Sequence, residues 1–331
     1  MNDRAEDTRP VLAVTLGDPA GIGPEIVVGT LAQPDASPLA RGIAVGDARV
    51  LRRAAEVCGI KVELNPVTSV DAAVSRPGVI DVLDLAEPDP ELPRFGEVQA
   101  SGGRAALRAI ETATSLAMSG DVDAVVTSPI NKEAVWAAGS SHLGHTELLA
   151  ELTGSASSST MFLVRGLKIF FTTRHTSLRK ALDQITLERV TSAIDDAYQA
   201  LQVFGHDQPR LAVAAVNPHA GESGAFGDEE QSVLIPAVEA AKARGMDVSG
   251  PVPVDTVFHH GLSGKYHGVL CHFHDHGHIA AKTYDFDGTV SVTTGIPILR
   301  TSVDHGTAFD IAGTGRASYE TMVAAYRAAA E

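Results

Sequence analysis

The stretch VLAVTLGDPAGIGPEI, Val11–Ile26, has the pattern of a buried strand that runs through a tight turn into a helix. Five of its first six residues are apolar and three of the six are β-branched, which predicts a strand. Two glycines then allow close turning of the backbone, and Pro24 suits the first turn of a helix. Ile26 stands where a dinucleotide fingerprint needs its third small residue, and no Gly-Lys-Ser/Thr of a phosphate-binding loop follows. We interpret the stretch as the first strand-turn-helix unit of an α/β fold.

The alternation of strands and helices continues along the chain and predicts doubly wound sheets. Predicted strands cover residues 42–46, 79–85, 123–127, 160–164, 168–173, 210–216, 268–270 and 289–294. Predicted helices cover residues 48–58, 99–119 and 186–203, a segment that begins near 146, a segment that ends at 243, and an Ala-rich segment at the carboxyl end. A chain of 331 residues is long enough for two such domains.

Composition narrows the class of protein. Hydrophobic residues make up 44% of the chain, and no apolar run approaches the roughly 20 residues of a membrane span. The charged start MNDRAEDTRP does not resemble a signal peptide, and the two cysteines suggest neither a disulfide framework nor a cysteine metal site. We therefore expect a cytoplasmic protein without a membrane partner. The net charge of −15 disfavours nucleic acid as a partner but leaves a small anionic substrate open.

The stretch CHFHDHGHIAAK, Cys271–Lys282, places four histidines, a carboxylate and an amine behind a short apolar run. A solvated histidine-rich loop is one interpretation. His175 and His219, however, also follow apolar runs that predict buried strands. Histidines beyond the ends of three strands would lie at the edge where open α/β sheets bind ligands. Because imidazole is the commonest side-chain metal ligand, this pattern favours a catalytic metal site over a zinc-finger-like clip.

Two further segments suggest binding. His145 and Thr146 begin a predicted helix whose amino end favours a phosphate or carboxylate, although an ordinary cap is the alternative for Thr146. The Gly-rich segment Asn217–Glu230 is long for a connection, and long ordered loops often carry function. Lys282 suits an anionic substrate, with a surface ion pair as the alternative.

Motifs along the whole chain lie in the order found in the 4-hydroxythreonine-4-phosphate dehydrogenase family, which this sequence resembles from about Val11 to Ala317. The motifs are GDPAGIGPEI, SPINKEA, GHTELLAELTG, TTRH, NPHAGE, HDHGHIAAK and IPILRTSVDHGTAFDIAG. The closing DHGTAFDIAGTGRA also resembles the cofactor loop of isocitrate and isopropylmalate dehydrogenases, whose fold the family shares. The resemblance implies two doubly wound α/β domains of that type. Residues 1–128 and 289–331 would form a terminal domain on the cofactor side, and 129–288 an inserted domain with the metal ligands and dimer contacts, with the cleft between them.

The resemblance also implies site residues, position by position. A divalent ion (zinc, magnesium, manganese or cobalt) is expected at a homodimer interface, with ligands from both subunits. The implied metal ligands are His175, His219 and His274. The implied substrate-binding residues are His145, Thr146, Lys282, Ser291 and Arg300. The nicotinamide cofactor, NAD with NADP as the alternative, is expected near Asp255, His305, Gly306, Asp310 and Gly313. Lys282 is the candidate for proton transfer and Asp275 for orienting a ligand or relaying a proton, with a purely structural role as the alternative for Asp275.

Two departures from the family pattern bear on the substrate. Ser291 stands where the vitamin B6 enzymes carry asparagine, so one substrate contact is shorter. The Gly-His-Ile of HDHGHIAAK replaces their Gly-Leu-Pro and resembles the branch that oxidises 4-phospho-D-threonate and 4-phospho-D-erythronate. A cis-dihydrodiol carboxylate dehydrogenase of aromatic catabolism shares this Gly-His-Ile. Arg300 favours a phosphorylated substrate, because a guanidinium matches phosphate well.

The expected function is NAD-dependent oxidation of a phosphorylated 3-hydroxy acid with metal-assisted loss of CO₂. The candidate substrates are 4-phospho-D-threonate, 4-phospho-D-erythronate and 4-hydroxythreonine 4-phosphate. The dihydrodiol carboxylate dehydrogenase is the alternative within this class. A three-histidine lyase or hydrolase that does not use NAD, and a non-catalytic metal-holding protein, are the alternatives from other classes.

Overall fold

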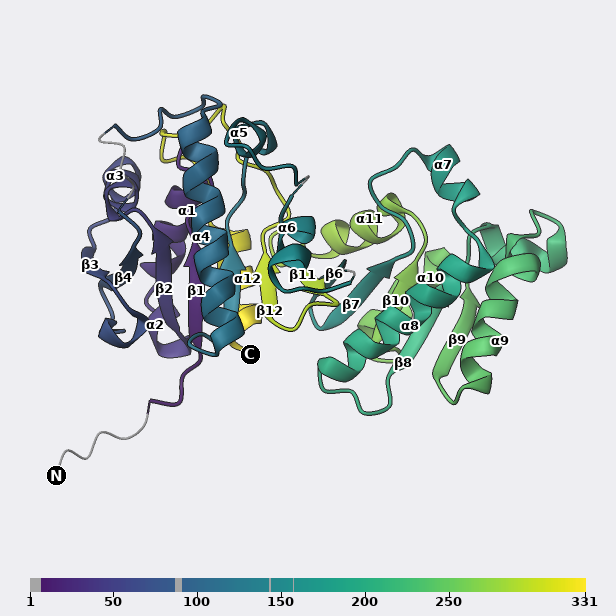
Figure 1. Ribbon diagram of the computed structural model, residues 1–331. Coiled ribbons are helices and arrows are strands. Elements are labelled where there is room, and N and C mark those ends of the chain that lie inside the picture. Colours follow the sequence, from purple (N-terminus) through teal and green to yellow (C-terminus); the bar gives the residue numbers. More distant parts are fainter. Residues whose placement is uncertain (1–6, 87–90, 143, 157) are drawn as a thin grey trace. The chain divides into compact units, whose positions relative to one another are not determined.

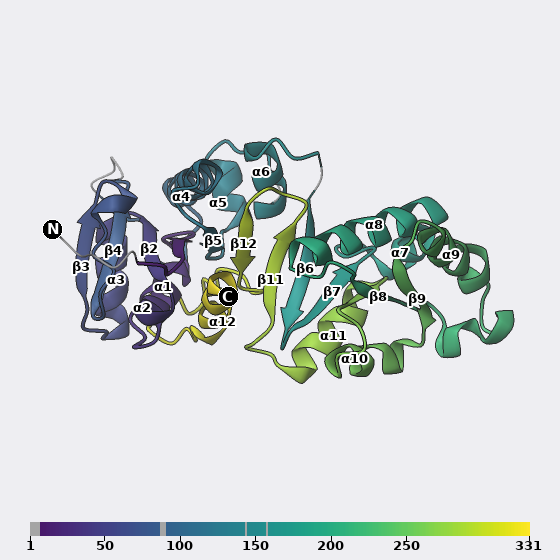
Figure 2. The ribbon, with the colours of Figure 1, turned by 90° about the horizontal axis from the view of Figure 1, so that it is seen from below.

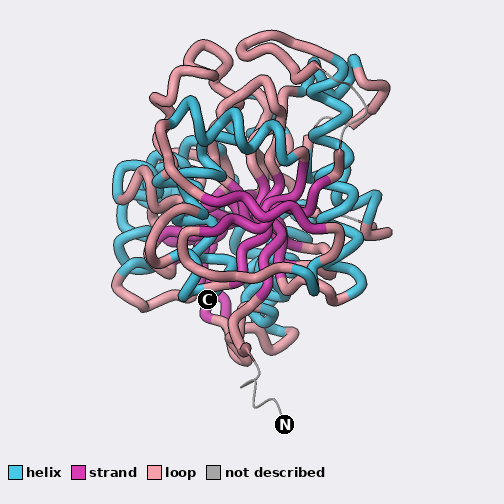
Figure 3. Tube along the Cα trace, turned by 90° about the vertical axis from the view of Figure 1, so that its left-hand side faces the viewer, coloured by secondary structure: helices cyan, strands magenta, loops and turns pink. Residues whose placement is uncertain are grey.

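The computed structural model describes residues 7–86, 91–142, 144–156 and 158–331, and the chain divides into two compact units. The first unit comprises Met1–Ser158 with Val290–Glu331, and the second comprises Ser159–Thr289. In both units the strands lie inside and the helices lie outside them (Figures 1 and 3). The predicted α/β class is confirmed.

An apolar strand lies within the sheet of the first unit. β1 (Val11–Thr15) pairs in parallel with β2 on one side and β5 on the other, and Leu12, Ala13 and Val14 have no exposed surface. Such a run is expected for a strand covered on both faces. The strand order is β3-β4-β2-β1-β5-β12-β11, with β11 antiparallel to β12 and the other neighbours parallel. The bounds are β2 (Arg41–Gly46), β3 (Glu63–Val67), β4 (Val79–Asp84), β5 (Ala124–Thr127), β11 (Val290–Thr294) and β12 (Leu299–Ser302).

Helices cover both faces of this sheet (Figure 2). On one face α4 buries Ala109 and Ala113 against Ile43 and Val125, while α1 and α12 lie on the other face. Gly59 ends α3 in the left-handed conformation with φ of 64°, as the sequence predicts. The bounds are α1 (Gly23–Leu31), α2 (Ala36–Leu39), α3 (Ala48–Cys58), α4 (Ala100–Ser119), α5 (Lys132–Ala137), α6 (His145–Leu152) and α12 (Glu320–Ala330).

The boundary between the units falls later than the sequence-based division after residue 128. Residues 129–158 belong to the first unit, because α5 and α6 both pack on α4. The approach of α5 is close enough that a Cβ at Gly103 would lie 2.0 Å from the carbonyl oxygen of Ala134. Only glycine fits there, so this contact ties α5 to the first unit.

The sheet of the second unit is arranged around β10 (Gly268–Cys271), which pairs in parallel with β7 and β8. The strand order is β6-β7-β10-β8-β9, and β6 is antiparallel to β7. Val269 packs with Phe162, Ile169 and Val257 in a buried apolar cluster. The other strands are β6 (Ser159–Val164), β7 (Leu167–Phe171), β8 (Arg210–Ala214) and β9 (Asp247–Val252). The helices are α7 (Leu178–Asp183), α8 (Leu187–Val203), α9 (Ile235–Ala243), α10 (Val254–Leu262) and α11 (His274–Tyr284), with α8 and α9 on one face and α10 and α11 on the other (Figure 2).

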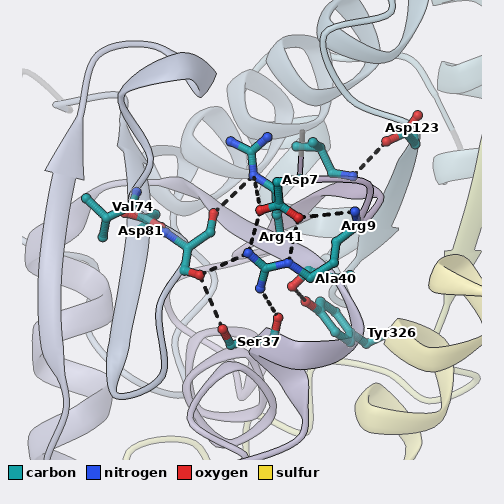
Figure 4. A network of polar contacts seen from close by, with 11 residues as sticks. Asp7, Arg9, Ser37, Ala40, Arg41, Val74, Asp81, Asp123 and Tyr326 are labelled. Carbon is teal, nitrogen blue, oxygen red and sulfur yellow. Dashed lines mark hydrogen bonds and ion pairs between the residues drawn. The ribbon is translucent and has the colours of Figure 1, made fainter. Parts of the chain in front are cut away.

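A polar network anchors the chain just before β1 (Figure 4). Arg9 donates from its Nε to Asp7, 2.9 Å away, and from Nη2 to the carbonyl of Ser75 at 3.3 Å. The buried carboxylate of Asp81 accepts hydrogen bonds from the backbone nitrogen of Ser75 (2.8 Å) and of Val74 (3.1 Å). These contacts hold the chain in place from Asp7 onward. None of the helices among the described residues combines the length and the apolar character that a membrane span requires.

Candidate active site

Three neighbouring strands of the second unit end at one edge, and each leads to a histidine. β7, β10 and β8 are adjacent and parallel, so their carboxyl ends meet there. His175 follows β7, His274 begins α11 directly after β10, and His219 follows β8. The strands predicted before these histidines are therefore present, and they bring the three segments to the same edge of the sheet.

The structure brings two of these histidines close together within one chain. The rings of His175 and His274 have centroids 6.0 Å apart. The ring of His219 instead neighbours Phe226, at 6.4 Å. Within the described ranges, no group of three or more His, Cys, Asp and Glu side chains is arranged to hold a metal ion.

The histidine-rich stretch folds as a helix, α11, which its residue pattern did not indicate. In α11, His274, His278 and Lys282 recur every four residues and share one face. The rings of His274 and His278 stack with centroids 3.6 Å apart, and the His278 ring packs against Phe162 at 4.4 Å. Gly277 is buried, and a Cβ at this position would clash with the ring of Phe171. The alternative of a solvated loop is therefore wrong.

The two candidate catalytic side chains lie on α11. Asp275 is exposed, and its Oδ1 lies 2.7 Å from Nδ1 of His274. This contact leaves Nε2 of His274 as the nitrogen available to a metal ion, the usual arrangement for an oriented histidine ligand. The ammonium group of Lys282 lies 5.4 Å from the ring centroid of Phe286.

The segment that carries His219 is a left-handed turn. The residues His219, Ala220, Gly221, Glu222 and Ser223 have φ values from 41° to 75°. Left-handed backbone costs about 1–2 kcal/mol for each residue that is not glycine. The turn therefore depends on support from its surroundings.

Glu230 provides that support from the π-helical turn Glu230–Leu234. Its buried carboxylate accepts hydrogen bonds from the backbone nitrogens of Val216 and Asn217, at 2.8 and 2.7 Å, and from the side chain of Asn217 at 2.9 Å. Burial opposes ionisation of Glu230, but these hydrogen bonds outweigh it and hold its pKa below the usual value. Glu230 thus stays charged and fixes the chain immediately before His219.

His272 differs from the other histidines of the cluster, because it has no exposed surface. Its Nε2 lies 2.7 Å from the carbonyl oxygen of Ala214, and its Nδ1 lies 3.0 Å from the hydroxyl of Thr172. Burial lowers the pKa of His272 to about 4, so the ring is neutral at physiological pH. A carbonyl oxygen can only accept, so Nε2 carries the proton and Nδ1 accepts from Thr172.

In the first unit, Arg300 lies on a polar face of β5, β11 and β12. Its guanidinium is buried and donates to the hydroxyl groups of Thr127 and Thr293, at 2.9 and 3.1 Å. Ser291 pairs with Ser302, two positions from the pair formed by Thr293 and Arg300, so it shares their face. Arg300 and Ser291, two predicted substrate-binding residues, are therefore brought together.

His145 begins α6 in the same unit. Its Nε2 is buried and has no hydrogen-bond partner in the part of the chain that the structure describes. Burial, and then the positive charge of Arg300, hold the pKa of His145 well below its usual value. Thr146 follows in the first turn, where Gly144 provides no side-chain cap. The open amino end of this helix, a neutral imidazole and a guanidinium form a set that suits an oxyanion. We call it the anion set: His145, Thr146, Ser291 and Arg300.

The predicted cofactor loop rests on the turn that opens the chain's first helix. The backbone nitrogen of Ile22 donates to the carbonyl oxygen of Thr307 at 3.0 Å. The buried carboxylate of Glu25 accepts from the backbone nitrogens of Gly313 and Gly315, at 2.7 and 3.1 Å. The GDPAGIGPEI turn thus holds the loop in place through these hydrogen bonds. Its local sequence pattern did not indicate this role.

The other predicted cofactor residues are exposed. His305 contacts Thr321 through Nε2 at 3.0 Å. Gly306 and Asp310 lie in the same loop, while Asp255 lies in the first turn of α10, in the second unit. The structure therefore groups His305, Gly306, Asp310 and Gly313 in one loop, without Asp255.

Asp18 is a buried carboxyl group in the same turn as Glu25. Its Oδ1 accepts a hydrogen bond from the backbone nitrogen of Ala20 at 2.9 Å. Its Oδ2 is buried and, among the described residues, has no hydrogen-bond partner. Burial raises the pKa of Asp18 to about 6.

These features define an α/β protein with a histidine-rich edge on one unit and, on the other, a polar face that carries the buried guanidinium of Arg300. The chain belongs to the family described as pyridoxal phosphate biosynthetic protein PdxA, whose model matches residues 38–329. A relative from Cutibacterium acnes with the name "Putative D-threonate 4-phosphate dehydrogenase" is 53% identical over 97% of this chain and 93% of its own. The structure of a 4-hydroxythreonine-4-phosphate dehydrogenase from Klebsiella pneumoniae has a TM-score of 0.91 at 45% identity, covering 97% of this chain and 98% of its own. A terephthalate 1,2-cis-dihydrodiol dehydrogenase from Burkholderia xenovorans has a TM-score of 0.65 at 30% identity, covering 97% of both chains.

The comparisons confirm the family expected from the sequence, and the high TM-scores show that the chain has the α/β fold of these relatives. The three relatives are named dehydrogenases, which agrees with the expected oxidoreductase class. Membership of this dehydrogenase family implies a nicotinamide cofactor and a divalent metal ion.

Proposed function

We propose that the protein oxidises the secondary alcohol of a phosphorylated hydroxy acid with NAD and promotes loss of CO₂ from the product. D-threonate 4-phosphate is the first candidate substrate, because it is named for a relative that is 53% identical over nearly the whole chain. The observation that carries the proposal is the anion set, in which a buried guanidinium, a neutral imidazole and an open helix end lie in one unit. D-erythronate 4-phosphate and 4-hydroxythreonine 4-phosphate are the next candidates.

Each part of the anion set has a distinct task. The planar guanidinium of Arg300, held by two threonine hydroxyls, donates to two oxygens of a phosphate at once. The buried Nε2 of His145 supplies a further hydrogen bond. Ser291 is shorter than an asparagine and leaves room on the same face of the strands for a larger group on the substrate.

The second unit supplies the donors for the metal ion. His175 and His274 fit part of such a site, since their rings are 6.0 Å apart and Asp275 orients His274. We propose that His219 completes the ligand set, which is shared between two copies of the chain in a homodimer. Three neutral nitrogens favour a borderline metal such as zinc. When bound, the ion would polarise the reacting carbonyl group and favour loss of CO₂.

Lys282 and Asp275 are the proposed proton carriers. Both lie on α11, Asp275 next to His274 and Lys282 about two turns beyond it on the same helix face. Lys282 would move the proton of the reacting group or hold the anionic end of the substrate. The loop that includes His305, Gly306, Asp310 and Gly313 is proposed to hold the cofactor, which supplies the hydride chemistry, and Asp255 is proposed to lie near it.

A substrate panel tests this function. The purified protein is given NAD, a divalent ion and each acid in turn, and the absorbance of the reduced nicotinamide is followed. We expect the highest kcat/KM with 4-phospho-D-threonate. Arg300→Lys should lower it by about 10- to 100-fold, because hydrogen bonds to charged groups contribute about 1.5–3 kcal/mol. The same variant should lose little with the unphosphorylated acid.

Other outcomes would reject the proposal. Faster oxidation of a cyclic dihydrodiol carboxylate than of any phosphorylated acid would instead support the alternative suggested by the dihydrodiol dehydrogenase relative. Consumption of a substrate without reduction of NAD would point to a lyase or hydrolase.

A further inference from the structure

His272 lies between the segments that lead to the three candidate metal ligands. It follows β10 directly, and β10 is the strand between β7 and β8. Through its ring it reaches the ends of both neighbours, Thr172 after β7 and Ala214 at the end of β8. The residue that follows β10 therefore connects its own strand to the ends of both neighbouring strands.

The backbone of His272 strengthens the connection to β7. Its carbonyl oxygen accepts from the backbone nitrogen of Thr173 at 3.2 Å and from the hydroxyl of Thr173 at 2.7 Å. Thr172 in turn donates its backbone nitrogen to the carbonyl oxygen of Cys271 at 2.8 Å. The segment that leads to His175 is thus fixed by two consecutive residues of the segment that leads to His274.

The ring bond to Ala214 acts on the third segment. Beyond Ala214 the chain leaves the sheet and enters the left-handed turn that carries His219. Glu230 holds Val216 and Asn217 from one side. The Nε2–H group of His272 holds the carbonyl of Ala214 two residues earlier, so the approach to His219 is fixed at two points.

We propose that His272 is a positioning residue that holds in place the segments of its own chain that carry His175, His219 and His274. The inference rests on the proposed metal site. His272 itself does not bind the ion, because both of its ring nitrogens are engaged in hydrogen bonds within the sheet edge. The position requires an imidazole, because the same side chain must donate a hydrogen bond to Ala214 and accept one from Thr172. The amide of a glutamine or asparagine is too short to reach both groups.

Substitutions at position 272 separate the two ring bonds. His272→Leu fills much of the volume and removes both hydrogen bonds. His272→Gln places an amide N–H near the position of Nε2 and restores a donor to Ala214, whereas His272→Asn reaches only toward Thr172. His259→Leu, at an exposed histidine of α10, is the matched control.

The readout is the affinity of the full-length protein for Zn²⁺, measured by competition with a chelator, together with kcat and KM. We expect His272→Leu to bind Zn²⁺ about 10- to 100-fold more weakly, the usual effect of losing a residue that orients metal ligands. Partial recovery is expected in His272→Gln, less in His272→Asn, and wild-type affinity in His259→Leu. Melting curves in the presence of chelator report the stability of the metal-free protein separately.

Wild-type Zn²⁺ affinity in His272→Leu, or a loss of affinity that merely follows the fall in melting temperature of the metal-free protein, would overturn the proposal. If His272→Leu does not fold, the comparison of His272→Gln with His272→Asn decides the question, and equal affinities in these two variants would count against it. His219→Ala tests the metal site itself. Wild-type Zn²⁺ affinity in His219→Ala would show that the proposed function has failed, independently of His272.

Discussion

At the scale of single residues, several polar groups of this protein are buried where their ionisation or pairing is costly. Asp18 and His272 lie close to predicted functional segments, yet neither is among the residues that the resemblance implies. Asp18 is 1% exposed, and its second carboxyl oxygen lacks a partner among the described residues. Because this carboxyl group is buried, its ionisation makes the stability of the protein depend on pH.

The pKa of Asp18 is raised from 3.8 to about 6 in the folded protein. Below pH 3.8 the carboxyl group of Asp18 is protonated in the folded and the unfolded state, and the free energy of unfolding is not reduced. As the pH rises from there through about 6, the free energy of unfolding falls, because the folded state then holds an unfavourable buried charge. The loss amounts to about 3 kcal/mol, at about 1.36 kcal/mol for each unit of pKa. Asp18→Asn cannot ionise, so it should gain roughly that much relative to the wild type between pH 4 and pH 7.

Urea unfolding at several pH values measures this effect. The exposed Asp287→Asn serves as the control and should follow the wild-type profile. Parallel profiles for Asp18→Asn and the wild type would show that Asp18 is not the group responsible.

At the scale of helices and strands, the sequence predicted those elements whose signals are local. The strand that precedes each of the three histidines was predicted because its residues are apolar and β-branched, and α3 because Gly59 ends it. α11 was missed because histidines and a glycine give it a weak helical pattern, and its stability comes from packing of Gly277 on β7. β9 and α10 were missed where prolines interrupt the apolar pattern.

Contacts between distant elements could not be predicted from local pattern. Glu25 lies in the first turn of α1, and a carboxylate there suits an ordinary helix start. In the structure it binds the backbone of the loop near the other end of the chain. The local signal was correct about the helix but could not indicate which distant nitrogens the carboxylate would reach.

Glu25→Gln tests that contact. A glutamine can accept from only one of the two backbone nitrogens, because its amide N–H₂ group replaces the other oxygen. We expect the free energy of unfolding to fall by about 1–3 kcal/mol, the cost of a buried polar group left unpaired. Affinity for NAD, measured by fluorescence titration, should also fall if the loop holds the cofactor. Glu320→Gln, an exposed acid in the first turn of α12, is the matched control, and equal effects of the two substitutions would contradict the assigned role.

At the scale of the whole molecule, the question is whether one chain or two supply the proposed metal ligands. In one chain His175 and His274 are close, and His219 is not part of a three-ligand group among the described residues. A site shared by two copies would account for this, since a symmetric dimer contributes the same surface twice and forms two equivalent sites.

Mixing two inactive variants distinguishes a shared site from one built within a single chain. His219→Ala and His274→Ala are combined and their subunits are allowed to exchange. If His219 and His274 of one site come from different chains, each hybrid dimer contains one site with all ligands intact and one site that lacks two. Activity should then return to about a quarter of the wild-type value, because half of the dimers are hybrids and each has one working site. If both histidines come from the same chain, every site in the mixture lacks a ligand, and activity stays at the level of either variant exchanged with itself. That second result would refute the shared site, while the proposed chemistry would still be tested separately by the substrate panel.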